Sequence, residues 1–185
     1  LKAKGTKFVQ RASWSRAASF YERAETYLKD EDDSDFKDDE EKAAKRRTQL
    51  ALHLNLALCY LKTQEFTRAV ECCDKALNMD AECDKALFRR GQAHSALGNL
   101  EEARADYQRA VSVAPNNKAV RSELVKVQQL IKKQREAEKK TFFGMFDKFA
   151  AHDAKNQVKP AETEVAVDAA VDGEAVANPS NEVEI

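Results

Sequence analysis

The chain has 185 residues, and its 31 lysines and arginines nearly balance its 32 aspartates and glutamates, for a formal net charge of −1. The charge is unevenly distributed, because residues 30–41 carry −8, residues 153–185 carry −6, and the other 140 residues carry +13. Glycine (5) and proline (3) are scarce, which excludes a fold built from many strands and turns. The helix-forming residues that dominate predict an all-α protein with a cationic body and two acidic segments.

The first residues, LKAKGTKF, contain no apolar core of a signal peptide, and no stretch approaches the roughly 18 apolar residues of a membrane span. We therefore expect no membrane partner and a cytoplasmic location, with the nucleus as a second compartment. The chain begins inside an amphipathic pattern and without an initiator methionine, so we expect a piece of a longer protein.

The cysteines and histidines show no zinc-binding spacing and no C-x-x-C pair. We expect the cysteines to be reduced packing residues rather than metal ligands or nucleophiles, and we expect no cofactor. The four are Cys59, Cys72, Cys73 and Cys83.

An offset of 34 residues aligns residues 50–83 with residues 84–117 without a gap. Small residues recur at the same places in both copies, and an earlier copy has small and aromatic residues at matching intervals. The matches are Ala57 with Gly91, Ala69 with Ala103, Ala76 with Ala110, and in the early copy Gly5, Ala17, Tyr21 and Ala24. Together with the late Pro115, this is the tetratricopeptide repeat pattern.

Small side chains in the middle of both helices of a pair allow the helices to approach closely, while Tyr21 and Tyr107 fill the seam. Such pairs bury their apolar faces by stacking. The pattern predicts three helix-turn-helix repeats in a right-handed superhelical solenoid, closed by a capping helix.

The predicted repeats cover about 1–31, 50–83 and 84–117. The acidic insert 30–41 is expected to be a solvated loop, followed by a backward extension of the next helix from Glu41. Residues 118–149 are expected to form the capping helix, and residues 150–185 a disordered acidic tail.

In this architecture the first helix of each pair lines a concave groove. Its polar residues are expected to be Lys2, Thr6, Asn55, Lys85 and Arg89. Lysine and arginine attract carboxylates, and asparagine can pair with a peptide backbone. The groove is therefore expected to bind an acidic peptide end.

At these residues the chain resembles a known family. Lys2, Asn55, Lys85 and Arg89 stand where co-chaperones with these repeats carry a dicarboxylate clamp for the C-terminal EEVD of heat shock protein 90 or 70. The segments HLNLALCYLK, KALFRRGQAH and EAEKKTFFGMF resemble the C-terminal half of the large FK506-binding immunophilins. The chain differs from the family at two places. It has Thr6 where many clamp domains have asparagine, and it has Phe142 and Phe143 where relatives often have a tyrosine after a charged run.

The resemblance implies an adaptor that docks a prolyl isomerase onto a chaperone, while these 185 residues contain no candidate active site. Alternatives are the same module from a cyclophilin-type immunophilin, a chain that is itself an isomerase, and a nucleic-acid binder. For nucleic-acid binding, the sequence lacks an aromatic stacking platform and a recognition motif.

The helix near 120–149 also has a basic amphipathic pattern that resembles calmodulin targets. Its residues are Lys132, Lys133, Arg135, Lys139, Lys140, Phe142, Phe143 and Phe146. The alternative is a solvated capping helix. The terminal residues 182–185 end in an apolar residue with a valine two positions before it, as ligands of PDZ-type grooves do. A match this short often arises by chance.

Overall fold

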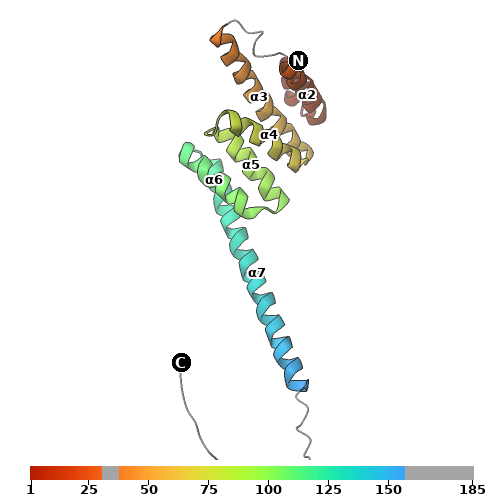
Figure 1. The fold of residues 1–185 in the computed structure, drawn as a ribbon, viewed down its shortest axis with the longest axis vertical. Coiled ribbons are helices and arrows are strands. Elements are labelled where there is room, and N and C mark those ends of the chain that lie inside the picture. Colours follow the sequence, from red (N-terminus) through yellow and green to blue (C-terminus); the bar gives the residue numbers. More distant parts are fainter. Residues whose placement is uncertain (31–37, 157–185) are drawn as a thin grey trace, which may run out of the picture. The chain divides into compact units, whose positions relative to one another are not determined.

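The computed structural model describes residues 1–30 and 38–156, and these residues form seven α-helices without a strand (Figure 1). The predicted all-α class is confirmed. Most of the acidic insert and residues 157–185 of the predicted tail lie outside the described residues, whereas residues 150–156, which the sequence assigned to the disordered tail, are helical. The helices are α1 (Lys2–Gln10), α2 (Trp14–Asp30), α3 (Asp39–Thr63), α4 (Phe66–Met79), α5 (Asp84–Leu97), α6 (Leu100–Val113) and α7 (Lys118–Asn156).

The helices pair as α1–α2, α3–α4 and α5–α6, and each pair packs against the next through α2–α3 and α4–α5 contacts. The small residues of the repeat lie where the predicted close approaches occur. A Cβ built on Gly5 would lie 2.6 Å from Cε1 of Tyr21, and one built on Gly91 would lie 2.7 Å from Cε1 of Tyr107. Both tyrosines are buried. Glycine therefore allows the first helix of the first and third repeats to contact the tyrosine ring of its partner helix.

The turn inside each pair uses a left-handed backbone at the equivalent position. The φ angles are 52° at Ala12, 65° at Gln64 and 85° at Gly98. This conformation ends a helix at low cost only in glycine, so the first two repeats carry backbone strain that the third avoids.

The core of unit 1, residues Leu1–Phe142, consists of two clusters that meet along α3. Leu52 and Leu56 belong to the cluster formed with α1, α2 and the first part of α4. Leu50 and Leu54 pack instead against the cluster that contains Tyr107, Val120 and Ile131. The four cysteines are free and buried, as expected of packing residues.

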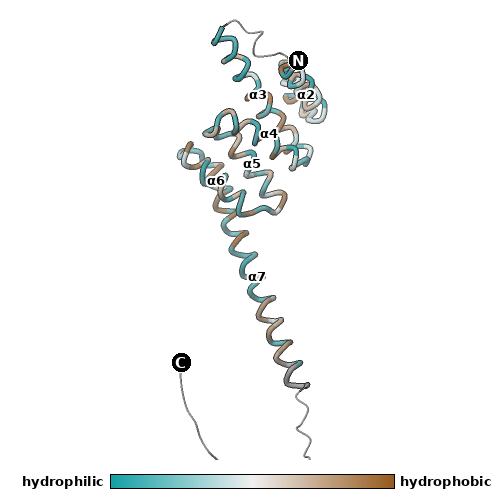
Figure 2. Tube along the Cα trace, in the orientation of Figure 1, coloured by the Kyte–Doolittle hydropathy of each residue, from teal (hydrophilic) through white to brown (hydrophobic). Residues whose placement is uncertain are grey.

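The helix α3 begins at Asp39, inside the segment that was expected to be a loop up to Glu41. Its first turn contains Asp39, Glu40 and Glu41, and carboxylates in a first turn are stabilised by the helix dipole. Figure 2 shows this hydrophilic start of α3. The extension continues the repeat helix backward, much as predicted.

The helix α7 carries the expected apolar stripe, with Val120, Val127 and Ile131 buried and Leu124 half-buried. It ends at Asn156, beyond the boundary at residue 149 that the sequence suggested. The part of α7 from Phe143 to Asn156 belongs to a second unit. None of the described helices is both long enough and apolar enough to cross a membrane.

Candidate peptide-binding site

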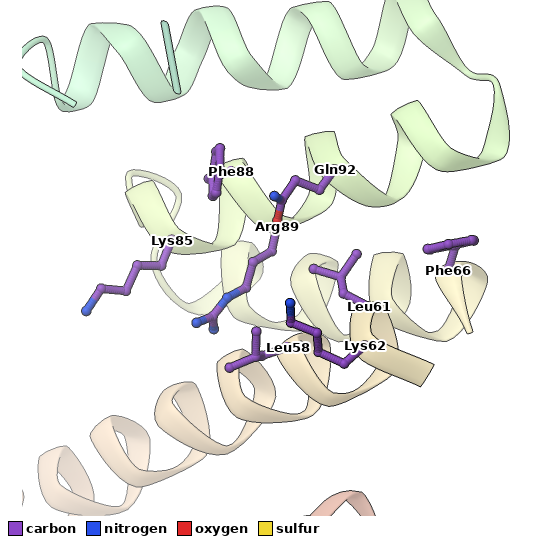
Figure 3. Close-up of a pocket in the computed structure, with 8 residues that line it drawn as sticks. All are labelled: Leu58, Leu61, Lys62, Phe66, Lys85, Phe88, Arg89 and Gln92. Atoms are coloured by element: carbon purple, nitrogen blue, oxygen red, sulfur yellow. The ribbon is translucent and has the colours of Figure 1, made fainter. Parts of the chain in front are cut away.

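A cavity of about 520 Å³ lies where α3, the start of α4 and α5 meet (Figure 3). Three cationic side chains line it, namely Lys62, Lys85 and Arg89. The other lining residues are Gln92 and the apolar Leu58, Leu61, Phe66 and Phe88. The cavity thus combines positive charge with an apolar wall, which suits a peptide that carries both carboxylates and aliphatic side chains.

Arg89 is held in place by a backbone contact. Its Nη1 donates a hydrogen bond of 2.6 Å to the carbonyl oxygen of Leu54. In Figure 3 its guanidinium points from α5 toward α3. Burial lowers the pKa of Arg89, but a guanidinium remains charged near neutral pH. The remaining N–H groups can donate to a carboxylate without reorganising the side chain.

Arg90 anchors α5 to both of its neighbouring helices, α4 and α6. Its guanidinium donates to both carboxylate oxygens of Asp106 on α6, at 2.9 and 2.6 Å, and to Asp74 on α4 at 2.5 Å. Asp106 is buried, so this bidentate pair is shielded from water. The network fixes α5 between its neighbours and thereby fixes the face that carries Lys85 and Arg89.

Lys62 was not identified from the sequence. It lies seven residues after Asn55, which places both side chains on one face of α3. Its Nζ also lies 5.9 Å from the centroid of the Trp14 ring, within the range of a cation–π contact. The seven-residue spacing from a groove residue was the signal that could have found it.

Of the five predicted clamp residues, Lys85 and Arg89 line the cavity, whereas Lys2, Thr6 and Asn55 are not among its lining residues. Asn55 is half-buried on α3, next to the residue whose carbonyl binds Arg89. Lys2 is exposed on α1.

The hydroxyl group of Thr6 is engaged within the protein. Its Oγ1 donates to the carbonyl oxygen of Lys2 at 3.1 Å and lies 3.1 Å from the hydroxyl of Tyr21. A hydroxyl has one proton. Thr6 can therefore donate to a ligand only after it gives up its bond to Lys2, so it links α1 to α2 in this conformation.

The basic residues of α7 do not all lie on one face of the helix. Lys132, Arg135 and Lys139 line a cleft with α6, whereas Lys133 and Lys140 do not. Phe142, Phe143 and Phe146 have 58–62% of their surface exposed. Calmodulin binding stays a prediction, and residues 182–185 lie outside the described part of the chain.

Within residues 1–30 and 38–156, no group of three or more His, Cys, Asp or Glu side chains could hold a metal ion.

The tetratricopeptide repeat family matches residues 50–83 and 84–117, the two copies that align without a gap. The chain thus carries tetratricopeptide repeats at these two segments. Among curated relatives, it is 41% identical over 184 residues to the Bos taurus peptidyl-prolyl cis-trans isomerase FKBP4. The match covers 99% of the chain and 38% of that relative. The resemblance to the repeat region of the FK506-binding proteins is thus confirmed.

Solved structures agree with this assignment. The C-terminal repeat domain of a Plasmodium falciparum protein described as FK506-binding superposes with a TM-score of 0.66 at 28% identity. That match covers 73% of this chain and 88% of the other. The second repeat domain of human RPAP3, in complex with the HSP70 peptide SGPTIEEVD, has a TM-score of 0.55 at 29% identity and covers 69% and 91% of the two chains. The first repeat domain of Spaghetti, bound to the HSP90 peptide SRMEEVD, has a TM-score of 0.55 at 28% identity and covers 70% and 89%.

Proposed function

We propose that this chain is an adaptor that captures the acidic C-terminal peptide of heat shock protein 90 or 70. The observation that carries the proposal is the cavity in which Arg89, held by the Leu54 carbonyl, lies with Lys85 and Lys62. Two similar repeat domains bind peptides that end in EEVD. By analogy, the acidic end of such a peptide would lie in this cavity.

The last residue of such a peptide carries two carboxylates, one on its side chain and one at the free terminus. Lys85 and Arg89 would hold one of them through charge-assisted hydrogen bonds. Asn55 and Lys2, on the neighbouring first helices, would hold the other. Phe66 and Phe88 offer an apolar wall to the aliphatic residue that precedes the last one.

The relatives that share this region are named prolyl isomerases, and the chain spans 38% of the length of the first of them. The adaptor would therefore bring an attached isomerase domain to a cytoplasmic chaperone, while the repeats themselves bind without catalysis. An assay of prolyl isomerisation by this chain alone should give the uncatalysed rate, and a rate that grows with protein concentration would contradict the separation of roles.

The residue assignment is tested by isothermal titration with the peptide SRMEEVD. Lys85 is exposed, so Lys85→Ala removes its charge without disturbing the core. We expect affinity to fall at least about tenfold, the effect of losing one hydrogen bond to a charged group. Lys2→Ala should weaken binding as well. Lys4→Ala is its matched control and should bind normally, because Lys4 lies on the opposite side of α1. Normal binding by Lys85→Ala with unchanged helicity would contradict the assignment.

A further inference from the structure

A second cationic cleft lies between α6 and α7, entirely within the unit Leu1–Phe142, and is separate from the cavity around Arg89. Its volume is about 360 Å³. Four cations and one acid line it, namely Arg104, Lys132, Arg135, Lys139 and Glu136. The peptide proposed for the first cavity does not involve these residues, so they need an explanation of their own.

Glu101 organises the guanidinium groups of this cleft. Its Oε2 lies 2.8 Å from Nη2 of Arg104 on α6, and its Oε1 lies 2.7 Å from Nη2 of Arg135 on α7. One carboxylate thus positions two guanidiniums from two helices. Because Glu101 and Glu136 balance two of the four cations, the cleft keeps an excess positive charge.

Arg104 also has a donor that nothing in the described structure satisfies. Its Nε is buried and has no hydrogen-bond partner. A buried N–H without an acceptor is costly, and in a native protein such a group calls for an explanation, for example a bound water, ion or ligand. The side chain as a whole is 39% exposed, so a ligand can contact the guanidinium, although Nε itself is buried. The cleft therefore has excess charge and a buried donor without a partner among the described residues.

We propose that the α6–α7 cleft binds an acidic peptide segment in extended conformation, independently of the Arg89 cavity. The lining residues of α7 run from Gln128 to Lys139, about 16 Å along the helix axis at 1.5 Å per residue. That length matches about five residues of extended chain. A single phosphate group would occupy only part of it.

The polar groups of the cleft also suit a peptide. Gln108 and Gln128 supply carboxamides, each of which can donate to and accept from a peptide backbone. The guanidinium of Arg135 can bind a carboxylate with two parallel N–H groups. Glu136 would repel a segment in which every residue is acidic, so spaced acids should bind better than continuous ones.

The test uses the full chain and a fluorescein-labelled peptide, Ac-EAEAEAE-NH2, whose ends are blocked so that no terminal carboxylate can enter a clamp. Anisotropy titrations are made at 50 mM salt in the presence of saturating SRMEEVD. Lys132→Gln should lower the affinity about fivefold, whereas Lys133→Gln, at an exposed neighbour outside the cleft, should change it less than about twofold. Arg104→Lys, which keeps the charge but removes the Nε donor, should also weaken binding.

Equal effects of Lys132→Gln and Lys133→Gln would mean diffuse attraction to the cationic body and would overturn the proposal. A labelled-peptide affinity that is lower in saturating SRMEEVD than in a titration without it would also overturn it, because the two ligands would then share one site. Inorganic tripolyphosphate serves as the competing probe. If it binds more tightly than the peptide and depends on Lys132, the cleft is a phosphate site rather than a peptide site.

Discussion

Replacing Gly91 with alanine should destabilise the repeat domain, although alanine is the better helix former. The new Cβ would lie 2.7 Å from Cε1, 2.9 Å from Cδ1 and 3.1 Å from Cζ of Tyr107. Tyr107 is fully buried and cannot swing into solvent. Its ring also packs against Phe88, with 5.9 Å between ring centroids. The tyrosine can therefore move only by pushing on another side chain.

Two effects of opposite sign determine how much Gly91→Ala changes the unfolding free energy. Alanine gains about 1 kcal/mol over glycine in a helix interior. Forcing a methyl group into a packed core costs about 1–3 kcal/mol. Because a rigid, buried ring receives the clash, we expect the upper end of the cost and a net loss of about 2 kcal/mol. For a domain of this size, that loss lowers the melting temperature by about 4–8 °C.

Thermal unfolding followed by circular dichroism measures the effect, and the second repeat supplies the control. That repeat has Ala57 and Cys73 where the third has Gly91 and Tyr107. In a Tyr107→Cys background, Gly91→Ala should therefore become neutral or stabilising. Gly144→Ala, where nothing lies within 4 Å of the added Cβ, should not destabilise. Equal effects of Gly91→Ala in both backgrounds would refute the steric explanation.

Three further predictions concern the backbone and the buried titratable groups. Gln64→Gly should stabilise the protein by about 1 kcal/mol in urea unfolding, because φ at this position is 65°. Burial raises the pKa of Cys72 and of Cys73 to about 12, so iodoacetamide at pH 8 should label them only after unfolding. Burial lowers the pKa of His53. The stability that neutral His53 contributes is therefore present above about pH 6.5 and is lost as the pH falls. His53→Gln should flatten the dependence of the unfolding free energy on pH between about 5 and 7.

The repeat register was predictable because it depends on sterics between neighbouring helices. A helix that must approach a tyrosine ring tolerates only a small residue, so Gly5 and Gly91 mark the contacts directly in the sequence. Helical spacing predicted the positions of Lys85 and Arg89, since residues four apart on a groove helix lie on one face. The structure places both in the cavity.

Other features depend on contacts between distant residues, which spacing does not reveal. The engagement of Thr6 with Tyr21 follows from the packing of α1 on α2. The start of α3 at Asp39, inside the predicted solvated loop, reflects the preference of carboxylates for a first helical turn. The α6–α7 cleft requires Arg104 and Arg135 to meet across Glu101, although they are 31 residues apart in sequence.

The central claim, that the cationic cavity recognises the free end of an acidic peptide, is tested most directly by comparing two ligands. SRMEEVD and its C-terminally amidated form differ in one carboxylate. We predict that amidation weakens binding at least about tenfold and that added salt weakens the free peptide more strongly. Equal affinities of the two peptides at the same salt concentration would contradict the account.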